Sequence, residues 1–360
     1  MKRNRTDKKV RVLLVAPTKP LVGGQSIQAE RLERGFEDDS EVELVVQSMN
    51  PKFLPFLQRV SGVRTIVTSI KYWFDLLRKV PKSDVVHTFS ASYYSFIISP
   101  TPAVLIANLF QKPVILHYHS GEAGDHLKRW KKSTRTVLKR VNKIVVPSSF
   151  LVKVFKDNEF SAETIPNVIE TSQFSDSASK PEGLVFLSNR NLEPLYNVEC
   201  TIRAFAFIQK RFHEAALVLA GSGSESAHLK DVAQKLNLSN VAFCGSVSQT
   251  EMAKLFQGAD FYLNSSNIDN LPNSIIEAFA AGVPVISTNA GGIPYILENE
   301  RTGLLVDVGD CKGLAEAAIR LCENPEFAKT LADNAKQEVS KYVWKAVREE
   351  WVNAYRAVIK

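Results

Sequence analysis

Cysteine is scarce in this sequence. The four cysteines, Cys200, Cys244, Cys311 and Cys322, stand far apart, and none forms a C-x-x-C pair. This spacing argues against a zinc site and against the dense disulfide framework of small secreted domains. We therefore expect four reduced thiols and a cytoplasmic protein.

Long apolar runs are also absent. The most apolar stretch, residues 96–110, is interrupted by Pro100 and Pro102, so the sequence predicts no membrane-spanning helix. The apolar run at residues 10–17 is too short for the core of a secretory signal, and no small-residue cleavage site follows it. We interpret it as a buried first strand that follows a loose basic tail at residues 1–9.

Two further absences narrow the function. The net charge of +7 is not accompanied by a helix-turn-helix or an RNA-binding aromatic motif, so we expect no nucleic-acid partner. A nicotinamide-dependent oxidoreductase would carry G-x-G-x-x-G after the first strand. Residues 16–24 read APTKPLVGG instead, which disfavours that class.

What the chain does have is repeated alternation of strands and helices. Its 360 residues, 45% of them hydrophobic and 23% charged, suit two globular domains of about 150–180 residues each. Short, continuously apolar runs predict parallel strands that helices cover on both faces. The predicted strands are 10–15, 42–47, 84–88, 114–118 and 143–146 in the first half, and 183–187, 217–220, 241–244, 261–264, 285–287 and 303–306 in the second.

This alternation predicts an α/β protein with two Rossmann-like, doubly wound parallel sheets. The polar, turn-rich residues 171–183 read as a linker between domains at residues 10–170 and 184–341. Residues 342–360 have apolar side chains at helical spacing, and we expect a helix that packs back toward the N-terminal domain. Ligands of such sheets bind beyond the carboxyl ends of the strands, so we expect a cleft there.

The segment from Asp269 to Glu277 carries the strongest chemical signal. It reads DNLPNSIIE, follows an apolar strand, and contains a helix start near Ser274. A helix N-terminus offers free N–H groups to phosphate, and carboxylates accept hydrogen bonds from sugar hydroxyls. Spacing alone leaves open that Asp269 is an ordinary loop residue and Glu277 a solvated helix position.

The wider sequence resembles glycosyltransferase family 4. The resemblance rests on residues 240–247, 255–260, 269–292 and 302–306, and more weakly on residues 23–25, 84–87, 117–122 and 165–167. It covers nearly the whole chain and implies a GT-B fold, with an N-terminal acceptor domain and a C-terminal nucleotide-sugar domain. It also implies a retaining transferase that needs no metal or other cofactor.

The resemblance assigns roles to residues of the second half. Glu277 would hold the ribose hydroxyls of the donor, and Asp269 would contact its sugar. Arg190 would neutralise the diphosphate together with N–H groups near Asn273 and Ser274. Leu271 and Val247 complete the predicted nucleotide-sugar site, with Val247 in the loop where the family's backbone touches the base.

Two positions depart from the family pattern. The family usually has glutamate at position 269, and aspartate keeps the charge but shortens the reach. The family also has a lysine six residues after Arg190, where this chain has Tyr196. Tyrosine supplies no positive charge, so stabilisation of the leaving group would rest more on Arg190 and the helix end.

In the first half, the resemblance singles out His119 and Gly24. His119 matches the family's active-site histidine, which positions the transferring sugar. His117 lies two residues earlier on the same face of an extended segment, and we interpret it as structural. Gly24 follows Gly23 in the loop after the first strand, where glycine lets the backbone approach a diphosphate or acceptor.

The predicted function is transfer of a sugar from a nucleotide diphosphate sugar to a saccharide or lipid-linked acceptor, with His119, Arg190 and Asp269 catalytic. The alternative is a catalytically silent protein of the same fold that binds a nucleotide sugar or a partner. A basic stretch at residues 126–143 predicts either docking on the anionic inner face of the membrane or a solvated basic surface. The sequence leaves both open.

Overall fold

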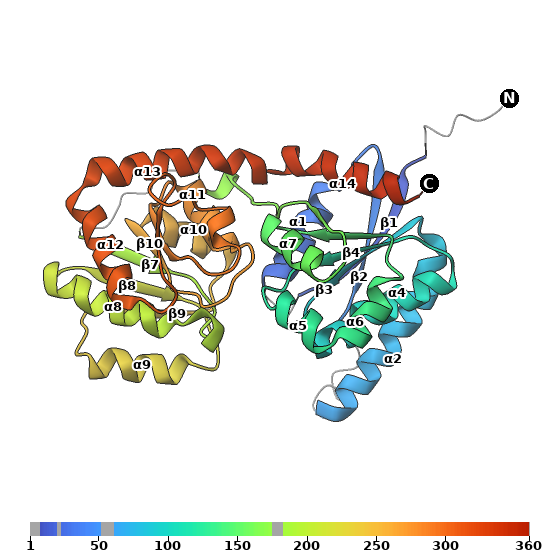
Figure 1. The fold of residues 1–360 in the computed structure, drawn as a ribbon, viewed down its shortest axis with the longest axis horizontal. Helices are drawn as coiled ribbons and strands as arrows, with labels where there is room; N and C mark the ends of the chain where they lie inside the picture. Colours follow the sequence, from blue (N-terminus) through green and yellow to red (C-terminus); the bar gives the residue numbers. More distant parts are fainter. Residues whose placement is uncertain (1–7, 20–22, 52–60, 175–182, 360) are drawn as a thin grey trace. The chain divides into compact units, whose positions relative to one another are not determined.

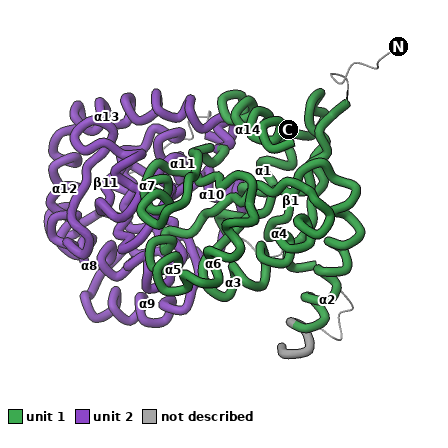
Figure 2. Tube along the Cα trace, turned by 45° about the vertical axis from the view of Figure 1, so that its right-hand side comes forward, with its two compact units in different colours: residues 1–168, 344–360 green, residues 169–343 purple. Residues whose placement is uncertain are grey.

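The computed structural model describes residues 8–19, 23–51, 61–174 and 183–359, with only the backbone of residues 61–65. Most of the predicted tail (residues 1–7) and of the predicted linker (residues 175–182) lies outside these ranges. The chain divides into two compact units, shown in Figure 2: unit 1 is residues 1–168 with 344–360, and unit 2 is residues 169–343.

Each unit is built on a six-stranded parallel sheet (Figure 1). Unit 1 has the order β2-β1-β3-β4-β5-β6, with β1 Val10–Ala16, β2 Val42–Ser48, β3 Val85–Ser90, β4 Val114–Tyr118, β5 Lys143–Val146 and β6 Glu163–Thr164. Unit 2 has the order β12-β11-β10-β7-β8-β9, with β7 Val185–Ser188, β8 Ala216–Ala220, β9 Val241–Gly245, β10 Phe261–Asn264, β11 Val285–Thr288 and β12 Leu304–Val306. The predicted pair of doubly wound parallel sheets is confirmed.

All eleven predicted strands form, with ends shifted by at most two residues. The edge strand β6 was not predicted, because two exposed polar residues, Glu163 and Thr164, give no apolar signal. The edge strand β9 is only half-buried, unlike the central strands, because no strand covers its outer side.

Helices of unit 1 cover both faces of its sheet. They are α1 Gly24–Gly35, α2 Ser61–Lys79, α3 Tyr94–Ile98, α4 Pro100–Leu109, α5 Ala123–Arg129, α6 Lys131–Leu138, α7 Ser149–Asp157 and α14 Trp344–Val358. One apolar core joins α2 to α7 with the sheet, and it includes Tyr72, Phe96 and Phe155. A second core on the other face joins α1 and α14.

Helix α14 is an integral part of unit 1. Trp351 and Tyr355 are fully buried in the second core of that unit. Arg348 donates through Nε to Asp39 Oδ2 at 2.6 Å and through Nη2 to Glu41 Oε1 at 3.0 Å. The end of the chain thus completes the domain that its beginning forms.

Unit 2 repeats the three-layer arrangement. Its helices are α8 Val198–Arg211, α9 Ser226–Lys235, α10 Gln249–Gln257, α11 Asn273–Ala281, α12 Cys311–Glu323 and α13 Pro325–Glu338. Helices α8, α9 and α12 share a core with one face of the sheet, and α10, α11 and α13 share a core with the other. Both sheets therefore expose their carboxyl-end loops as the places for a site.

Candidate nucleotide-sugar site

The strand order of unit 2 reverses between β7 and β10. These strands are neighbours in the sheet, while β8 and β11 lie on opposite sides of the pair. The loops that follow them must diverge, which opens a crevice at this switch point. Arg190 follows β7 and Asp269 follows β10, so the topology brings the two predicted charges together.

Arg190 is held on three sides. Its Nη2 forms an ion pair with Asp269 Oδ2, and its Nη1 donates to Ser274 Oγ at 3.0 Å. The ring of Tyr196 lies beside the guanidinium, 4.2 Å from its carbon to the ring centroid. Burial acts to lower the pKa of Arg190, but Asp269, Tyr196, Tyr262 and Glu277 together outweigh it, and the pKa is raised. The group is a permanently charged, oriented cation.

Asp269 is fixed by its loop as well as by Arg190. Its Oδ1 accepts from the Asn270 N–H at 2.8 Å. Burial raises the pKa of Asp269 by more than Arg190 lowers it. A free sugar hydroxyl or diphosphate that entered this site would have to share Arg190 with this carboxylate.

Two glycines of the loop after β11 lock the backbone of Asp269. Gly292 N–H donates to Asp269 O at 3.0 Å. A Cβ on Gly292 would lie 1.9 Å from Asn270 O, and one on Gly291 would lie 2.2 Å from Asp269 O. The sequence motif contained both glycines, but their packing role requires the fold to be known.

Helix α11 begins directly beyond Asp269, one residue earlier than predicted. Its N-cap is Pro272, whose side chain makes no capping bond, and Asn273 and Ser274 are its first residues. Glu277 lies one turn into the helix, is partly buried, and contributes to the raised pKa of Arg190. Leu271 is buried in the core and anchors the helix start. The helix thus presents its positive end beside Arg190.

The loop that carries Arg190 packs tightly on the loop after β8. A Cβ on Gly221 would lie 2.3 Å from Arg190 O, and one on Gly223 would lie 2.2 Å from Leu192 O. Leu192 N–H also donates to Ser222 O at 3.1 Å. Gly221 and Gly223 therefore allow the two loops to approach closely, because any side chain at either position would collide with the backbone of the Arg190 loop.

Val247 lies in the loop after β9, whose last residue, Gly245, has φ of +66°. Ser246 Oγ shares a hydrogen bond of 2.7 Å with Ser222 Oγ, which connects this loop to the one after β8. The loops after β7, β8 and β9 consequently form one connected edge of unit 2.

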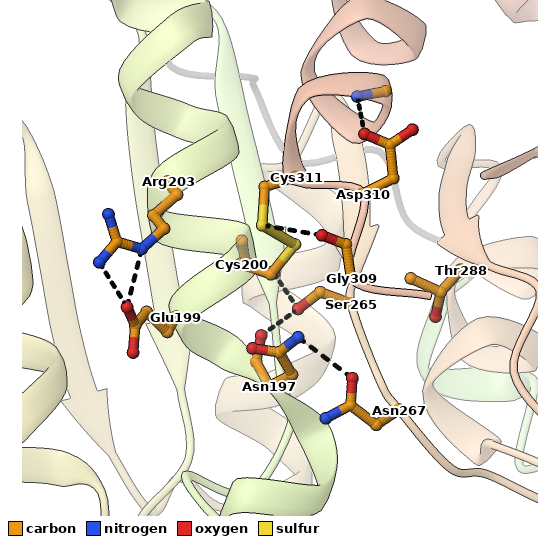
Figure 3. The surroundings of a disulfide bond; sticks show 12 residues. Asn197, Glu199, Cys200, Arg203, Ser265, Asn267, Thr288, Gly309, Asp310 and Cys311 are labelled. Carbon is orange, nitrogen blue, oxygen red and sulfur yellow. Dashed lines mark hydrogen bonds and ion pairs between the residues drawn. A yellow bond between two sulfur atoms is a disulfide. The ribbon is translucent and has the colours of Figure 1, made fainter. Parts of the chain in front are cut away.

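Unit 2 contains a disulfide, which corrects the expectation of four reduced thiols. Cys200 of α8 is bonded to Cys311, the first residue of α12 (Figure 3). The two cysteines are 111 residues apart in sequence, but both helices pack on the same sheet face, and their Cα atoms are 5.0 Å apart. Cys244 and Cys322 are free thiols. A reducing compartment therefore no longer follows from the cysteines.

The start of α8 is also tied to the loop that carries Asp269. Ser265 Oγ donates to Asn197 O at 2.7 Å, and Asn197 Nδ2 donates to Asn267 Oδ1 at 3.1 Å (Figure 3). Asn197 adopts a left-handed conformation with φ of +45°. This cluster fixes the Asp269 loop at its beginning, as the two glycines after β11 fix it further along.

Tyr262 of β10 was not predicted from sequence. Its hydroxyl donates to Asn189 Oδ1 at 2.8 Å, and burial raises its pKa to about 12. It lies within an apolar strand, next to the loop that carries Arg190. Because its neighbours in sequence are apolar, the sequence indicated a core residue and gave no sign of the hydrogen bond to Asn189. Only its hydroxyl in an otherwise buried strand could have drawn attention to it.

The switch point of unit 1 lies between β1 and β3. Gly24 begins α1 after β1, and nothing lies within 4 Å of a Cβ built on Gly23 or Gly24. Gln25 Nε2 donates to Ser90 O at the end of β3, at 3.4 Å. The open space above the glycines leaves backbone accessible to a ligand.

His119 follows β4 and belongs to a cluster of rings. The backbone N–H of His119 donates to Ser90 O at 3.1 Å. The centroid of its ring lies 4.0 Å from that of His117 and 4.7 Å from that of Phe89. Burial lowers the pKa of His119 to about 3. The imidazole is therefore neutral at physiological pH and acts as a polar group without charge.

His117 is fully within the core of unit 1. Its Nδ1 lies 3.3 Å from His87 Nε2, and His87 Nδ1 lies 2.9 Å from Tyr355 Oη. Burial lowers the pKa of His87 to about 3 and that of His117 well below its usual value. The structural role predicted for His117 agrees with this position.

The basic stretch 126–143 spans the end of α5 and all of α6, with Trp130 between the two helices. His126 and Leu127 are buried in the core, while Lys128, Arg129, Lys131 and Lys132 are exposed. Among the described residues, no helix is long and apolar enough to cross a bilayer.

Comparison with known proteins follows the division into units. Residues 170–338 match the model of the family described as glycosyl transferases group 1, and residues 22–173 match that described as glycosyltransferase family 4. N-acetyl-alpha-D-glucosaminyl L-malate synthase of Bacillus anthracis is 32% identical over 150 residues, which are 41% of this chain and 39% of that enzyme.

Solved structures resemble the whole chain. Anabaena Alr3699/HepE, in complex with UDP and glucose, has a TM-score of 0.76 at 16% identity and covers 97% of this chain and 100% of its own. Sucrose-phosphate synthase of Thermosynechococcus elongatus has a TM-score of 0.78 at 18% identity, with coverage of 97% and 99%. At these identities the likeness establishes the fold.

Two doubly wound sheets with these structural relatives define a two-domain α/β protein of the GT-B fold. The two family matches overlap at residues 170–173 and together span residues 22–338. The chain belongs to glycosyltransferase family 4, with its group 1 transferase region in unit 2. The resemblance seen in the sequence is thereby confirmed.

Proposed function

We propose that the protein is a retaining, metal-independent glycosyltransferase that transfers a sugar from a nucleotide diphosphate sugar to a saccharide or lipid-linked acceptor. The observation that carries the proposal is the position of Arg190, clamped by Asp269 and Ser274 at the start of α11. A buried guanidinium and a helix N-terminus together form a site for a diphosphate.

In the proposed reaction, Arg190 and the N–H groups at Asn273 and Ser274 receive the negative charge of the departing diphosphate. The bond between the anomeric carbon and the phosphate oxygen breaks, and its electron pair leaves with the diphosphate. The acceptor hydroxyl forms the new bond on the same face and loses its proton to a phosphate oxygen. Glu277 would hold the ribose, and Asp269 the sugar, once Arg190 turns toward the diphosphate.

UDP-sugars are the first donors to test, because the HepE structures contain UDP and glucose. The enzyme is incubated with UDP-, GDP- and ADP-sugars and with saccharide or lipid-linked acceptors, and products are followed by proton NMR. We expect one donor to react, the product to keep the donor's anomeric configuration, and EDTA to leave the rate unchanged. An inverted product would contradict retention, and loss of activity in EDTA would contradict metal independence.

A catalytically silent binder is the second candidate, because Tyr196 stands where the family has a lysine. Slow hydrolysis of the donor without acceptor separates the two. A transferase releases free nucleotide diphosphate, and a variant with both Arg190→Ala and Glu277→Ala does not. A silent protein would bind the donor, detected as a raised melting temperature, and release nothing.

A further inference from the structure

Helix α2 of unit 1 exposes a stripe of large apolar side chains. Ile66, Ile70, Trp73, Phe74 and Leu77 recur at helical spacing, and each is more than 40% exposed. The opposite side of the helix places Tyr72 and Leu76 in the core. One side of α2 therefore packs in the core of unit 1, and the other exposes large apolar side chains; the helix itself is labelled in Figure 1.

The neighbouring helices extend this surface. Eleven of the eighteen exposed large apolar side chains in the described residues lie between residues 66 and 110. We call these eleven the apolar face; besides the α2 stripe it comprises Tyr94, Ile97, Ile98, Leu105, Leu109 and Phe110. Tyr72 Oη donates to Ser99 O at 2.6 Å, which fixes α2 against the start of α4. Apolar exposure concentrated in this way marks an interaction surface.

Positive charge is concentrated in the same part of the chain. Residues 61–143 contain fourteen lysine and arginine residues and four acidic residues, a net charge of +10, whereas the whole chain carries +7. The rest of the protein is therefore slightly acidic. Lys128, Arg129, Lys131 and Lys132 are exposed on α5 and α6.

Side-chain contacts place these cations in the same helical layer as the apolar face. The ring of Trp130, between α5 and α6, lies 5.1 Å from the ring of Tyr94. Asn108 Nδ2 of α4 donates to Arg140 O, just after α6, at 3.0 Å. These contacts connect the segment that carries the cations to the helices that carry the apolar face.

An open hollow of about 640 Å³ lies where α4 and α6 end. Lys112, Lys139 and Arg140 contribute to its lining, beside Asp84 and several amides. The exposed Leu109 and Phe110 directly precede this cationic group in the chain. The arrangement suits the phosphate of a headgroup whose acyl chains lie against apolar side chains.

We infer that the helical layer α2–α6 is a docking surface for an anionic phospholipid bilayer. The apolar face enters the interface, where tryptophan and tyrosine are favoured, and the cations meet lipid phosphates. A second copy of this chain fits less well, because it would bring the same excess of positive charge against itself. The inference concerns binding alone and holds whether or not the proposed transfer occurs.

The test is flotation of the full-length protein with vesicles of phosphatidylcholine, with and without phosphatidylglycerol, at low and high salt. We expect binding to the anionic vesicles at low salt and weaker binding to phosphatidylcholine alone. Replacing Ile70→Ser together with Phe74→Ser should weaken binding at least about tenfold. Phe207→Ser, an exposed phenylalanine on a helix of unit 2, is the matched control and should leave binding unchanged.

A charge variant tests the second half of the inference without touching α2. Lys131→Glu with Lys132→Glu should weaken binding to anionic vesicles about tenfold and leave binding to phosphatidylcholine unaffected. No binding to anionic vesicles at low salt would overturn the inference. A second result would also overturn it: light scattering shows that the wild-type protein is a dimer, the Ile70→Ser, Phe74→Ser variant is a monomer, and neither protein binds vesicles.

Discussion

The two units place opposite chemistry at equivalent positions of their sheets. At its switch point, unit 2 has a buried guanidinium, a carboxylate and a helix N-terminus. Unit 1 has glycine backbone and neutral imidazoles, with the pKa of His119 lowered to about 3 by burial. This difference supports the proposal that unit 2 holds the charged diphosphate, while unit 1 would offer hydrogen bonds to uncharged hydroxyls.

Removing Arg190 should have the largest effect of the changes that test this difference between the two units. We expect Arg190→Ala to lower kcat/KM by about 100- to 1,000-fold, because no other buried cation contacts Asp269 in the described residues. Arg203→Ala is the control: Arg203 is half-exposed and pairs only with a neighbour on its own helix. Initial rates with saturating acceptor measure both. Equal, small losses of kcat/KM in the two variants would mean that Arg190 does not take part in the reaction.

Acid should damage unit 1 before unit 2. His87, His117, His119 and His126 are all in unit 1, and burial lowers the pKa of each. Below their unfolded pKa of about 6.5, the unfolded chain binds protons that the folded chain does not, so stability falls as the pH falls. We expect about 1.4 kcal/mol per pH unit for each histidine that stays neutral, between pH 6 and pH 4.

Hydrogen exchange at pH 7 and pH 5 measures this difference by unit. Faster exchange in the strands of unit 1 at pH 5, with unit 2 less affected, would agree with the comparison. Uniform loss in both units would mean that carboxylates, which both units contain, dominate the pH dependence.

The glycines that lock the Asp269 loop provide a smaller, more local perturbation. Gly292→Ala places a Cβ 1.9 Å from Asn270 O, so the loop must shift at a cost of about 1–3 kcal/mol. We expect donor binding, measured by calorimetry, to weaken roughly tenfold or more. Gly124→Ala in α5 of unit 1 is the control, since the nearest atom is 3.9 Å from its new Cβ and helix propensity improves.

His119 should separate catalysis from donor binding. We expect His119→Ala to lower kcat about tenfold through lost positioning of the sugar, with the Kd for the free nucleotide diphosphate unchanged within about twofold. His213→Ala, at an exposed histidine of unit 2, should change neither quantity. A large rise in Kd for His119→Ala would mean that unit 1 takes part in nucleotide binding, which would contradict the proposed difference between the units.

Much of the fold and of the candidate site could be predicted from the sequence. Buried parallel strands are visible as short apolar runs, and the loops that follow them carry the polar residues. Asp269 and Ser274 were found in this way, whereas Arg190 and His119 were singled out by the resemblance to the family. The structure places Arg190, Asp269 and His119 in loops that follow strands and Ser274 at a helix start. Their roles in binding and catalysis remain predictions.

The features that sequence could not supply depend on distant segments meeting. The Cys200–Cys311 disulfide joins residues 111 positions apart, and only the shared packing of α8 and α12 brings them together. Gly291 and Gly292 were visible as letters of a motif, but their contact with Asp269 crosses between two strands.

We propose that unit 2 holds the nucleotide diphosphate mainly through the loops after β7 and β10 and the start of α11. Hydrogen exchange of the wild-type protein with and without UDP tests it most directly. We predict slower exchange in residues 189–197 and 267–281, with little change in unit 1. Protection confined to unit 1, or none in residues 267–281 at saturating UDP, would contradict it.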